Sequence, residues 1–287
     1  MSSVLTLIAG PGATVDAAAA IAELQAGGAK VQGSADWLAT DRACDIAFEG
    51  PASTIAQAGV DAVVQDTKGR RKMLLVADME STLIENEMLD DLAAIAGIGP
   101  RIAEITRCAM NGEIDFEGAL RERVGLLAGL DVAVLEQAYA GVIEISGGRT
   151  LAATMKKHGA TCAVVSGGFR FFTARVRDRL GFDIDQANDL LVENGKLSGR
   201  VREPILGRQA KLEALTRLAH VHRLELSQTV AVGDGANDLA MLQAAGLGVA
   251  FRAKPVVAAE ARARIDHSDL TALLYLQGYR ATEFVDV

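Results

Sequence analysis

Four short apolar runs, separated by helical stretches, constrain the fold of this chain more than any other feature. They are MLLVAD (73–78), CAVVSGG (162–168), TVAVGDG (229–235) and GLGVAF (246–251). Continuous apolar runs of this length, separated by helices, are typical of parallel strands that are buried on both faces. Because parallel strands are joined by crossover connections, the sequence predicts an α/β fold with a doubly wound parallel sheet over residues 73–287.

Two further units are expected around this sheet. An insertion between the first two runs, at about 86–145, contains only helical patterns interrupted by glycine. It predicts a small bundle of about four short helices set on the sheet. Residues 1–70 follow a strand, helix, strand, strand, helix order, with the second helix expected in ASTIAQAGVDAVVQDT (52–67). That order indicates a small N-terminal α+β domain.

Composition excludes several classes of function. The net charge of −8 argues against a nucleic-acid partner, because such proteins present a basic face. No apolar run approaches the ~20 residues of a membrane span, and the N-terminus lacks the basic region of a signal peptide. Cys44, Cys108 and Cys162 are isolated, with no CxxC pair, which predicts a reducing cytoplasm rather than a disulfide framework.

Polar side chains follow three of the apolar runs at the point where each predicted strand ends. Asp78 and Glu80 follow the first run, Ser166 lies at the end of the second, and Asp234 at the end of the third. Ligands of open α/β sheets bind at the carboxyl ends of the strands. Lys211 is expected in the first turn of a later helix. Carboxylates suit Mg²⁺ together with a phosphate, so these residues predict a magnesium and phosphate site.

Two nucleotide-binding motifs are absent from the sequence. GDGAND (233–238) lacks the third glycine of a dinucleotide fingerprint, and no GxxxxGK[ST] motif occurs. Instead, four segments resemble the motifs of haloacid dehalogenase-like (HAD) phosphatases. DMEST (78–82) resembles their DxDxT nucleophile motif, VVSGG (164–168) the second motif, Lys211 the third and GDGAND the fourth. The order and spacing match across residues 73–287, so the resemblance implies a HAD-like sheet with an inserted helical cap.

The resemblance narrows to the phosphoserine phosphatase family. ENEMLDDLA (85–93), AMNGEIDFEGALRERVGLL (109–127) and NGKLSGRV (194–201) are similar to segments of that family. Residues 1–70 resemble, more weakly, the small ACT-like domains that are fused to some of these enzymes. The resemblance implies Mg²⁺-dependent hydrolysis of O-phospho-L-serine, the last step of serine biosynthesis.

The resemblance also implies roles for individual residues. Asp78 would attack phosphorus and become an aspartyl-phosphate, which splits a very slow hydrolysis into two easier steps. Glu80 would protonate the departing serine oxygen and then deprotonate the attacking water. Mg²⁺ would be held by Asp78, Asp234 and the main-chain carbonyl of Glu80, and would neutralise phosphate charge.

A second group of residues would bind the phosphate. Ser166, the backbone N–H of Gly167 and Lys211 would hold its equatorial oxygens. Asn237 would help to hold the phosphate, and Asp238 would support either the metal or Lys211.

Substrate choice is expected to come from the helical insertion. Arg123 offers a planar guanidinium suited to the substrate carboxylate. Glu87 could meet the ammonium group, and Phe116 would form a wall over the site. All three correspond to substrate-binding positions of the phosphoserine phosphatase family.

Glu80 departs from the family pattern, because most phosphoserine phosphatases have Asp at the second acid position. Some relatives with DxE transfer the phosphoryl group to another alcohol such as homoserine, so a phosphotransferase is an alternative. A non-catalytic amino-acid sensor is a further alternative, although neither the nucleophile nor the lysine has been lost. The sequence leaves the oligomeric state open, a homo-oligomer included.

Overall fold

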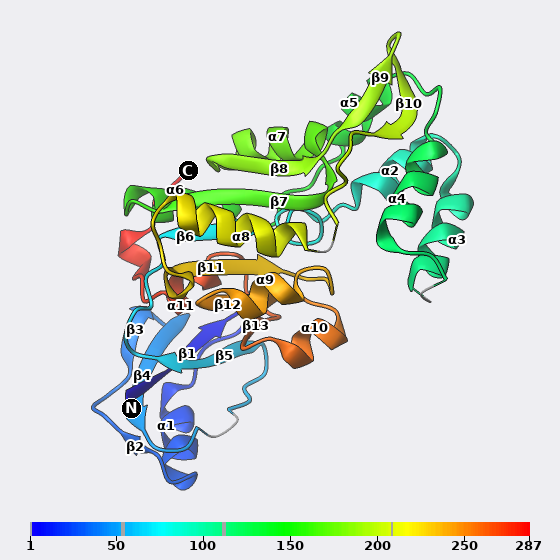
Figure 1. Cartoon of the computed structure of the whole chain (residues 1–287). Helices are drawn as coiled ribbons and strands as arrows, with labels where there is room; N and C mark the ends of the chain where they lie inside the picture. Colours follow the sequence, from blue (N-terminus) through cyan, green and yellow to red (C-terminus); the bar gives the residue numbers. More distant parts are fainter. Residues whose placement is uncertain (1, 53–54, 111–112, 208) are drawn as a thin grey trace.

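The fold was analysed in a computed structural model, which describes residues 2–52, 55–110, 113–207 and 209–287. Figure 1 shows the N-terminal sheet at one end, a central sheet flanked by helices, and a group of helices with a hairpin at the other end. No helix in the described part of the chain combines the length and the apolar character that a membrane crossing requires.

The central sheet is parallel throughout, with strand order β13-β12-β11-β6-β7-β8. Its strands are β6 (Leu74–Ala77), β7 (Thr161–Phe169), β8 (Ile184–Asn188), β11 (Thr229–Gly233), β12 (Leu247–Phe251) and β13 (Ala263–Ile265). The four predicted runs form β6, β7, β11 and β12, which confirms the expected parallel sheet. Strands β8 and β13, at its two edges, were not predicted.

Helices cover both faces of this sheet. Leu74 and Val76 of β6 pack in one apolar cluster with α8 and α9, whereas Leu75 and Ala77 belong to a second cluster with α6, α7 and α11. Successive residues of a strand point to opposite faces, so β6 is buried from both sides and the doubly wound fold is confirmed. The helices are α6 (Gly148–Lys157), α7 (Arg170–Leu180), α8 (Ala210–Val221), α9 (Leu239–Ala244), α10 (Pro255–Glu260) and α11 (Ala272–Leu276).

The insertion after β6 is helical, as predicted. It contains α2 (Met88–Ile95), α3 (Gly99–Met110), α4 (Phe116–Gly125) and α5 (Ala133–Ala140). Glycine or a short loop separates successive helices, which explains why the breaks could be predicted. A hairpin that was not predicted, β9 (Leu190–Glu193) and β10 (Lys196–Val201), packs against α4. Figure 1 shows these helices beyond the carboxyl end of β7, so they form a cap over the edge of the sheet where ligands are expected.

The N-terminal sheet is antiparallel, with order β2-β4-β1-β5 and β3 paired to β4. It consists of β1 (Ser2–Ala9), β2 (Lys30–Val31), β3 (Asp36–Ala39), β4 (Ala43–Glu49) and β5 (Val60–Asp66), and α1 (Ala17–Ala26) covers one face. The opposite face contributes Ile8 and Val63 to the core that contains α11. Short 3₁₀ helices lie at Leu226–Gln228 and Ala281–Glu283.

The second helix predicted in the N-terminal region is wrong. Residues 60–66 form β5, which pairs with β1, and residues 53–54 lie outside the described residues. Asp61 and Val63 are buried while Ala62 and Val64 are exposed, an alternation that is typical of a strand. Alanine favoured a helix locally, but pairing with β1 prevails. The two domains expected at 1–70 and 73–287, and the ACT-like resemblance, stay predictions.

Candidate active site

The first acidic residue lies where β6 ends. The buried run of β6 is followed by Asp78, which is itself 5% exposed. The N–H of Asp78 donates to the carbonyl of Val232 (3.0 Å), which ties this loop to β11. Its Oδ1 accepts from the N–H of Met79 (2.8 Å). The backbone therefore holds the Asp78 carboxylate in one orientation at the carboxyl edge of the sheet.

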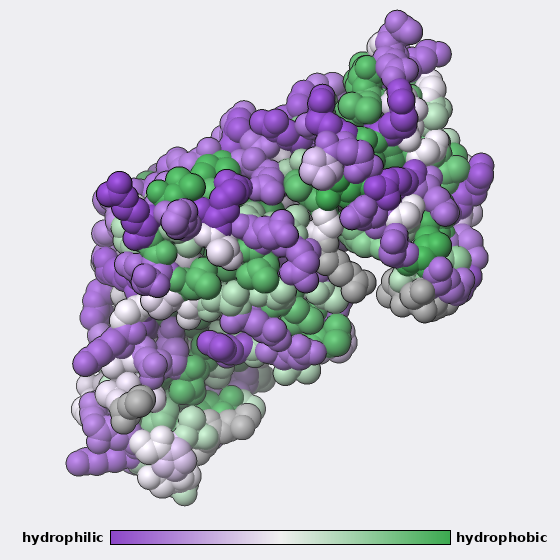
Figure 2. All heavy atoms as spheres, viewed as in Figure 1, coloured by the Kyte–Doolittle hydropathy of each residue, from purple (hydrophilic) through white to green (hydrophobic). Residues whose placement is uncertain are grey.

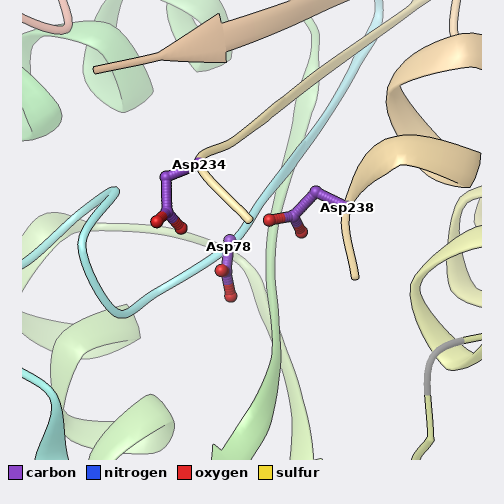
Figure 3. A group of neighbouring side chains, drawn as sticks. All are labelled: Asp78, Asp234 and Asp238. Carbon is purple, nitrogen blue, oxygen red and sulfur yellow. The ribbon is translucent and has the colours of Figure 1, made fainter. Parts of the chain in front are cut away.

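Three carboxylates converge at this edge (Figure 3). Asp78 follows β6, Asp234 follows β11, and Asp238 is the residue that begins α9. One oxygen of each lies within 4.8 Å of the others. Asp238 also accepts from the N–H of Gly235 (3.0 Å), which closes the tight turn of GDGAND. Like charges this close repel one another strongly, so the cluster requires cations.

Lys211 supplies one of those cations. It lies in the first turn of α8, as predicted, and is 3% exposed. Its Nζ lies 2.8 Å from Asp78 Oδ1 and donates to Asp238 Oδ1 at 2.5 Å. Burial acts to lower the pKa of Lys211, but Asp78 and Asp238 raise it above its ordinary value. Lys211 therefore stays an ammonium and binds the two carboxylates together.

The acids of the cluster respond to burial. Burial raises the pKa of Asp78, and the ammonium of Lys211 acts in the opposite direction. Burial, followed by the charge of Asp238, raises the pKa of Asp234 to about 6, whereas Lys254 lowers it. One lysine does not balance three acids, so a divalent cation would favour the ionised form of each.

The donor set fits a hard cation such as Mg²⁺ or another divalent ion. Both oxygens of Asp238 are engaged, one by Lys211 and one by Gly235. Among the described residues, the contacts to Asp78 all fall on Oδ1, which leaves Oδ2 for a ligand. Asp78 and Asp234 could therefore hold the ion, with Asp238 beside them as a support.

Glu80 lies two residues after Asp78 and is half-buried. Its Oε1 accepts from the N–H of Met88 (2.9 Å), at the start of α2. A Cβ added to Gly168 would stand 2.9 Å from Glu80 Oε2 and 3.1 Å from Ser166 Oγ, so the carboxylate lies beside the turn after β7. Burial, assisted by the charge of Glu87, raises the pKa of Glu80 to about 7. Glu80 can therefore hold or release a proton near neutral pH.

The β7–α7 turn presents polar groups to the same place. Ser166 is 2% exposed, and its Oγ accepts from the N–H of Gly168 (2.9 Å), so its hydroxyl hydrogen is available to a ligand. Asn188 donates to the carbonyl of Gly167 (2.8 Å) and fixes the turn. Ser166, Gly167, Lys211 and Asn237 line a cavity of about 10 Å³, room for about one water molecule. These four residues supply the polar groups of the small cavity, whose remaining lining includes the apolar side chains of Phe116, Val165 and Leu206.

A larger cavity of about 770 Å³ lies between this edge and the cap. In Figure 2 the surface is hollowed between the lobe that contains α3 and α4 and the body of the molecule. From the cap, Arg123, Glu87 and Phe116 line the cavity. A Cβ on Gly167 would stand 3.3 Å from the ring of Phe116, so the ring lies against the β7–α7 turn.

The charged cap residues have partners of their own. Glu87 Oε1 accepts from the hydroxyl of Ser81 (2.8 Å). Arg123 is half-buried, and its Nε donates to the carbonyl of Ala119 (3.2 Å). Burial lowers the pKa of Arg123, and Asp90, followed by Glu80, acts in the opposite direction. Arg123 lines the cavity together with Glu80, Glu87 and Asp90, so it supplies a positive charge for a carboxylate ligand in an otherwise acidic part of the lining.

Comparison with known proteins places the chain in a family. The model for haloacid dehalogenase-like hydrolases matches residues 75–243. A phosphoserine phosphatase of Streptomyces coelicolor is 47% identical over 81% of this chain and 57% of its own length. That of Lactococcus lactis is 42% identical over 75% of this chain and 96% of its own length. The chain belongs to the phosphoserine phosphatase family of HAD-like hydrolases.

A solved structure supports this assignment across both sheets. The probable phosphoserine phosphatase of Vibrio cholerae, in its unliganded form, has a TM-score of 0.81 and 31% identity. The match covers 98% of this chain and 88% of that chain. The chain spans 55% to 65% of the length of several curated members of the phosphoserine phosphatase family.

The structure brings the predicted site residues of this phosphoserine phosphatase family member together. Lys211 and Asp238 lie behind Asp78, and the others line the larger cavity: Asp78, Glu80, Glu87, Phe116, Arg123, Ser166, Gly167, Asp234 and Asn237. The roles assigned to them stay predictions. Sequence reasoning missed Asp90 and Lys254, which also line the cavity. A signal for Lys254 was present, because it lies just past the carboxyl end of the fourth apolar run.

Proposed function

We propose that this chain is a Mg²⁺-dependent phosphoserine phosphatase that converts O-phospho-L-serine to L-serine and phosphate through an aspartyl-phosphate. One observation carries the proposal: an ion-paired Asp78, 2.8 Å from Lys211, lies at the base of a cavity that Arg123 lines from the cap. Asp78 can react with a phosphate, and Arg123 can bind a carboxylate. The names of the related phosphatases support the same substrate.

The metal has a defined place in this proposal. Asp78, Asp234 and the main-chain carbonyl of Glu80 would hold Mg²⁺, which supplies charge neutralisation at the phosphate. Asp238 would support Lys211, because Lys211 donates to its Oδ1 at 2.5 Å.

In the first step, Asp78 attacks phosphorus. A carboxylate oxygen of Asp78 forms a bond to phosphorus as the bond from phosphorus to the serine oxygen breaks. Lys211 favours the ionised form of Asp78 that attacks phosphorus, and afterwards lies next to the phosphorylated side chain. The product of this step is free serine together with an aspartyl-phosphate.

Glu80 moves the protons in both steps. It gives its proton to the departing serine oxygen, and then accepts a proton from the water that attacks phosphorus. The second step breaks the phosphorus bond to Asp78, releases phosphate and leaves Glu80 protonated again. A pKa of about 7 suits both roles, because either protonation state is accessible at neutral pH.

The phosphate is held by the groups around the small cavity. The Ser166 hydroxyl, the N–H of Gly167, the Lys211 ammonium and the Asn237 side chain would donate to its oxygens. Their hydrogen-bonding directions are fixed in part by the protein itself, since Ser166 Oγ already accepts from Gly168. Groups held in place in this way need little rearrangement as charge develops.

The cap would recognise the serine part of the substrate. Arg123 would bind the substrate carboxylate through its guanidinium, and Glu87 would accept from the ammonium. Phe116 lies against Gly167 and would limit the width of the site. A phosphoester without these two charged groups would lose both contacts.

The decisive experiment measures phosphate release from a panel of small phosphoesters, with Mg²⁺ and with a chelator. We expect strong preference for phosphoserine and loss of turnover without metal. Asp78→Asn should lower the rate by more than about a hundredfold, because the amide cannot attack phosphorus. Comparable rates on sugar phosphates and phosphoserine would contradict the substrate assignment.

Two added arms address the alternatives. Homoserine in the assay would yield phosphohomoserine if the chain is a phosphotransferase, and phosphate release would then fall. If no ester is turned over, calorimetry with free serine tests the sensor alternative.

The remaining expectations also belong to this proposal. A cytoplasmic location rests on Cys44, Cys108 and Cys162, which are all free thiols in the structure. The substrate is a small molecule, and neither nucleic acid nor membrane is an expected partner. Light scattering would measure whether the chain forms a homo-oligomer.

A further inference from the structure

Lys254 lies on the loop between β12 and α10, at the same carboxyl edge of the sheet as the acids. Its backbone N–H donates to the carbonyl of Asp234 (3.1 Å). Pro255 follows as the first residue of α10 and restricts the backbone there. The main chain of Lys254 is therefore attached directly to the loop that carries an acid of the cluster.

The side chain of Lys254 reaches the same acid. Its Nζ lies 4.0 Å from Asp234 Oδ2, and the side chain is 67% exposed. Within the described part of the chain, this is the one ion pair of Lys254. By contrast, Lys211 is 4% exposed and lies close to two carboxylates. The Lys254 ammonium is therefore held weakly, and it can leave Asp234 to pair with another anion.

The charges that line the cavity indicate what Lys254 can bind there. The charged residues that line it in the described part of the chain comprise two cations, Arg123 and Lys254, and the acids Asp78, Glu80, Glu87, Asp90 and Asp234. A phosphoester dianion that enters such a cavity is repelled by its walls. Arg123 lies on the cap, so Lys254 is the cation that the sheet edge presents toward open solvent.

A solvent-exposed lysine is often only part of a hydrated surface. Two observations set Lys254 apart: the hydrogen bond that attaches its backbone to Asp234, and its place in the lining of the cavity. Lys157, which is exposed at the end of α6, has neither feature. Lys157 therefore serves as a matched control for loss of one positive charge.

We infer that Lys254 is a substrate-binding residue: it offsets the charge of Asp234 before a divalent cation binds, and then contacts the phosphate of the incoming ester. The inference rests on the proposed phosphatase function. It requires effects of opposite sign, because one positive charge repels a cation and attracts an anion. A residue that only stabilises the fold would not produce this pair of effects.

The test compares Lys254→Met with Lys254→Arg, Lys157→Met and the unmodified chain. Calorimetry without substrate measures Mg²⁺ binding, and steady-state kinetics measure phosphoserine hydrolysis. In Lys254→Met, Mg²⁺ should bind about three- to tenfold more tightly and KM should rise about three- to tenfold. The value of kcat should stay within about twofold, because a contact that is equally strong in the bound ester and in the transition state affects KM alone. Lys254→Arg and Lys157→Met should resemble the unmodified chain in both measurements.

Two results would overturn the inference. One is an unchanged KM in Lys254→Met, whatever happens to metal binding. The other is weaker Mg²⁺ binding, which would mean that the variant has disturbed the acid cluster. If the unmodified chain neither binds Mg²⁺ nor hydrolyses phosphoserine, the proposed function has failed instead. If the unmodified chain is active and Lys254→Met behaves in the same way, only the inferred role of Lys254 is rejected.

Discussion

Glu80 is the residue at which this chain departs from its family, and the structure gives the longer side chain a partner. Its Oε1 reaches the N–H of Met88 at the start of α2, while Oε2 lies beside the β7–α7 turn. A side chain one methylene shorter reaches roughly 1–1.5 Å less far. The acid therefore connects the carboxyl edge of the central sheet with the first cap helix.

Glu80→Gln should separate the two chemical steps. Asp78 can still attack, but a serine leaving group now lacks its proton donor, so the first step with phosphoserine should slow by ~10²–10⁴-fold. An aryl phosphate has a good leaving group, so its first step should persist, followed by slow hydrolysis of the aspartyl-phosphate. Rapid-quench kinetics should show a burst of aryl alcohol. Equal slowing of the burst on both substrates would mean that Glu80 positions the loop and does not transfer protons.

The pH dependence of the first step should report the proton on Glu80. Burial and then Glu87 raise the pKa of Glu80 to about 7, so the acid form predominates below that value and is lost as pH rises. Single-turnover transfer from phosphoserine should therefore fall above about pH 7, approaching tenfold per pH unit. Transfer from an aryl phosphate should change much less across the same range. The same decline for both substrates would place the titrating group elsewhere.

At the scale of elements, one cap helix carries two of the predicted substrate contacts. Phe116 and Arg123 lie seven positions apart on α4, so they project from the same face of the helix. The Asp115 side chain accepts from the N–H of Gly118 and begins this helix with a capping bond. The two predicted substrate contacts thus lie on a short, capped helix above the sheet.

Arg123→Ala should distinguish recognition from chemistry. Loss of a charge-assisted contact costs ~1.5–3 kcal/mol, so kcat/KM for phosphoserine should fall about ten- to hundredfold. A phosphoester without a carboxylate should lose much less. Arg123→Lys is the matched variant, since it keeps the charge but not the planar fork. Equal losses on both substrates would assign Arg123 to the phosphate or to the fold.

The glycine pair of the β7–α7 turn should respond unequally to alanine. A Cβ at Gly168 would stand 2.9 Å from Glu80 Oε2, whereas one at Gly167 would stand 3.3 Å from the Phe116 ring. Gly168→Ala should therefore displace the acid and lower kcat by ~10²-fold, since misplacement near 1 Å can cost this much. Gly167→Ala should mainly raise KM, because only an apolar wall moves. Steady-state kinetics on phosphoserine would measure both, and a reversed order would contradict this placement of Glu80.

The elements that could be predicted are those whose local pattern agrees with their surroundings. Strands β6, β7, β11 and β12 are apolar because both of their faces are covered, and polar site residues lie at or near the ends of three of them, β6, β7 and β11. Strand β8, IDQAN, is polar and lies at a sheet edge, where Asp185 is paired with Arg177, so its sequence carries no apolar signal. Strand β13 spans only Ala263–Ile265, which is too short to show a period.

Other features depend on contacts between distant residues. Strand β5 follows an alanine-containing stretch with helical propensity, and only its pairing with β1 makes it a strand. Site residues at strand ends could be predicted, because topology brings strand ends together. Lys254 follows the fourth apolar run and could have been expected at this edge, whereas Asp90 could not be placed in the cavity, since its position depends on how the cap faces the sheet.

At the scale of the whole molecule, buried polar contacts join the N-terminal sheet to the central sheet. The Asp61 carboxylate of β5 accepts from the backbone N–H groups of Asp266, His267 and Ser268, at 2.8 to 3.1 Å, just after β13. A carboxylate with several backbone donors is well compensated for its burial. The two sheets are thus joined through hydrogen bonds that neither sheet could form alone.

Arg70 links the N-terminal sheet to helix α11, which packs in the core of the central sheet. It pairs with Asp45 of β4, with an Nη1 to Oδ2 distance of 2.5 Å, and the side chains are 13% and 11% exposed. Its other nitrogens donate to the carbonyls of Tyr275 and Leu276 in α11. By contrast, Arg42 pairs with Asp269 across the same interface at 3.4 Å and is 48% exposed. Arg70 and Arg42 therefore allow a buried ion pair to be compared with an exposed ion pair at the same interface.

Arg70→Ala should therefore destabilise the protein by about 2–4 kcal/mol, since it leaves Asp45 buried without its cation and removes one hydrogen bond from each of two carbonyls. Arg42→Ala should cost no more than about 1 kcal/mol, because exposed ion pairs contribute little.

Urea unfolding would measure both variants with two probes. Trp37, the single tryptophan, reports on β3, and far-ultraviolet circular dichroism reports mainly on the helices around the central sheet. If the buried bridges make one cooperative unit, both probes should give the same midpoint in the unmodified chain. If the Trp37 signal of the unmodified chain is lost at a lower urea concentration than the circular dichroism signal, the N-terminal sheet unfolds independently. Equal losses of stability in Arg70→Ala and Arg42→Ala would show that the burial of Arg70 adds no stability.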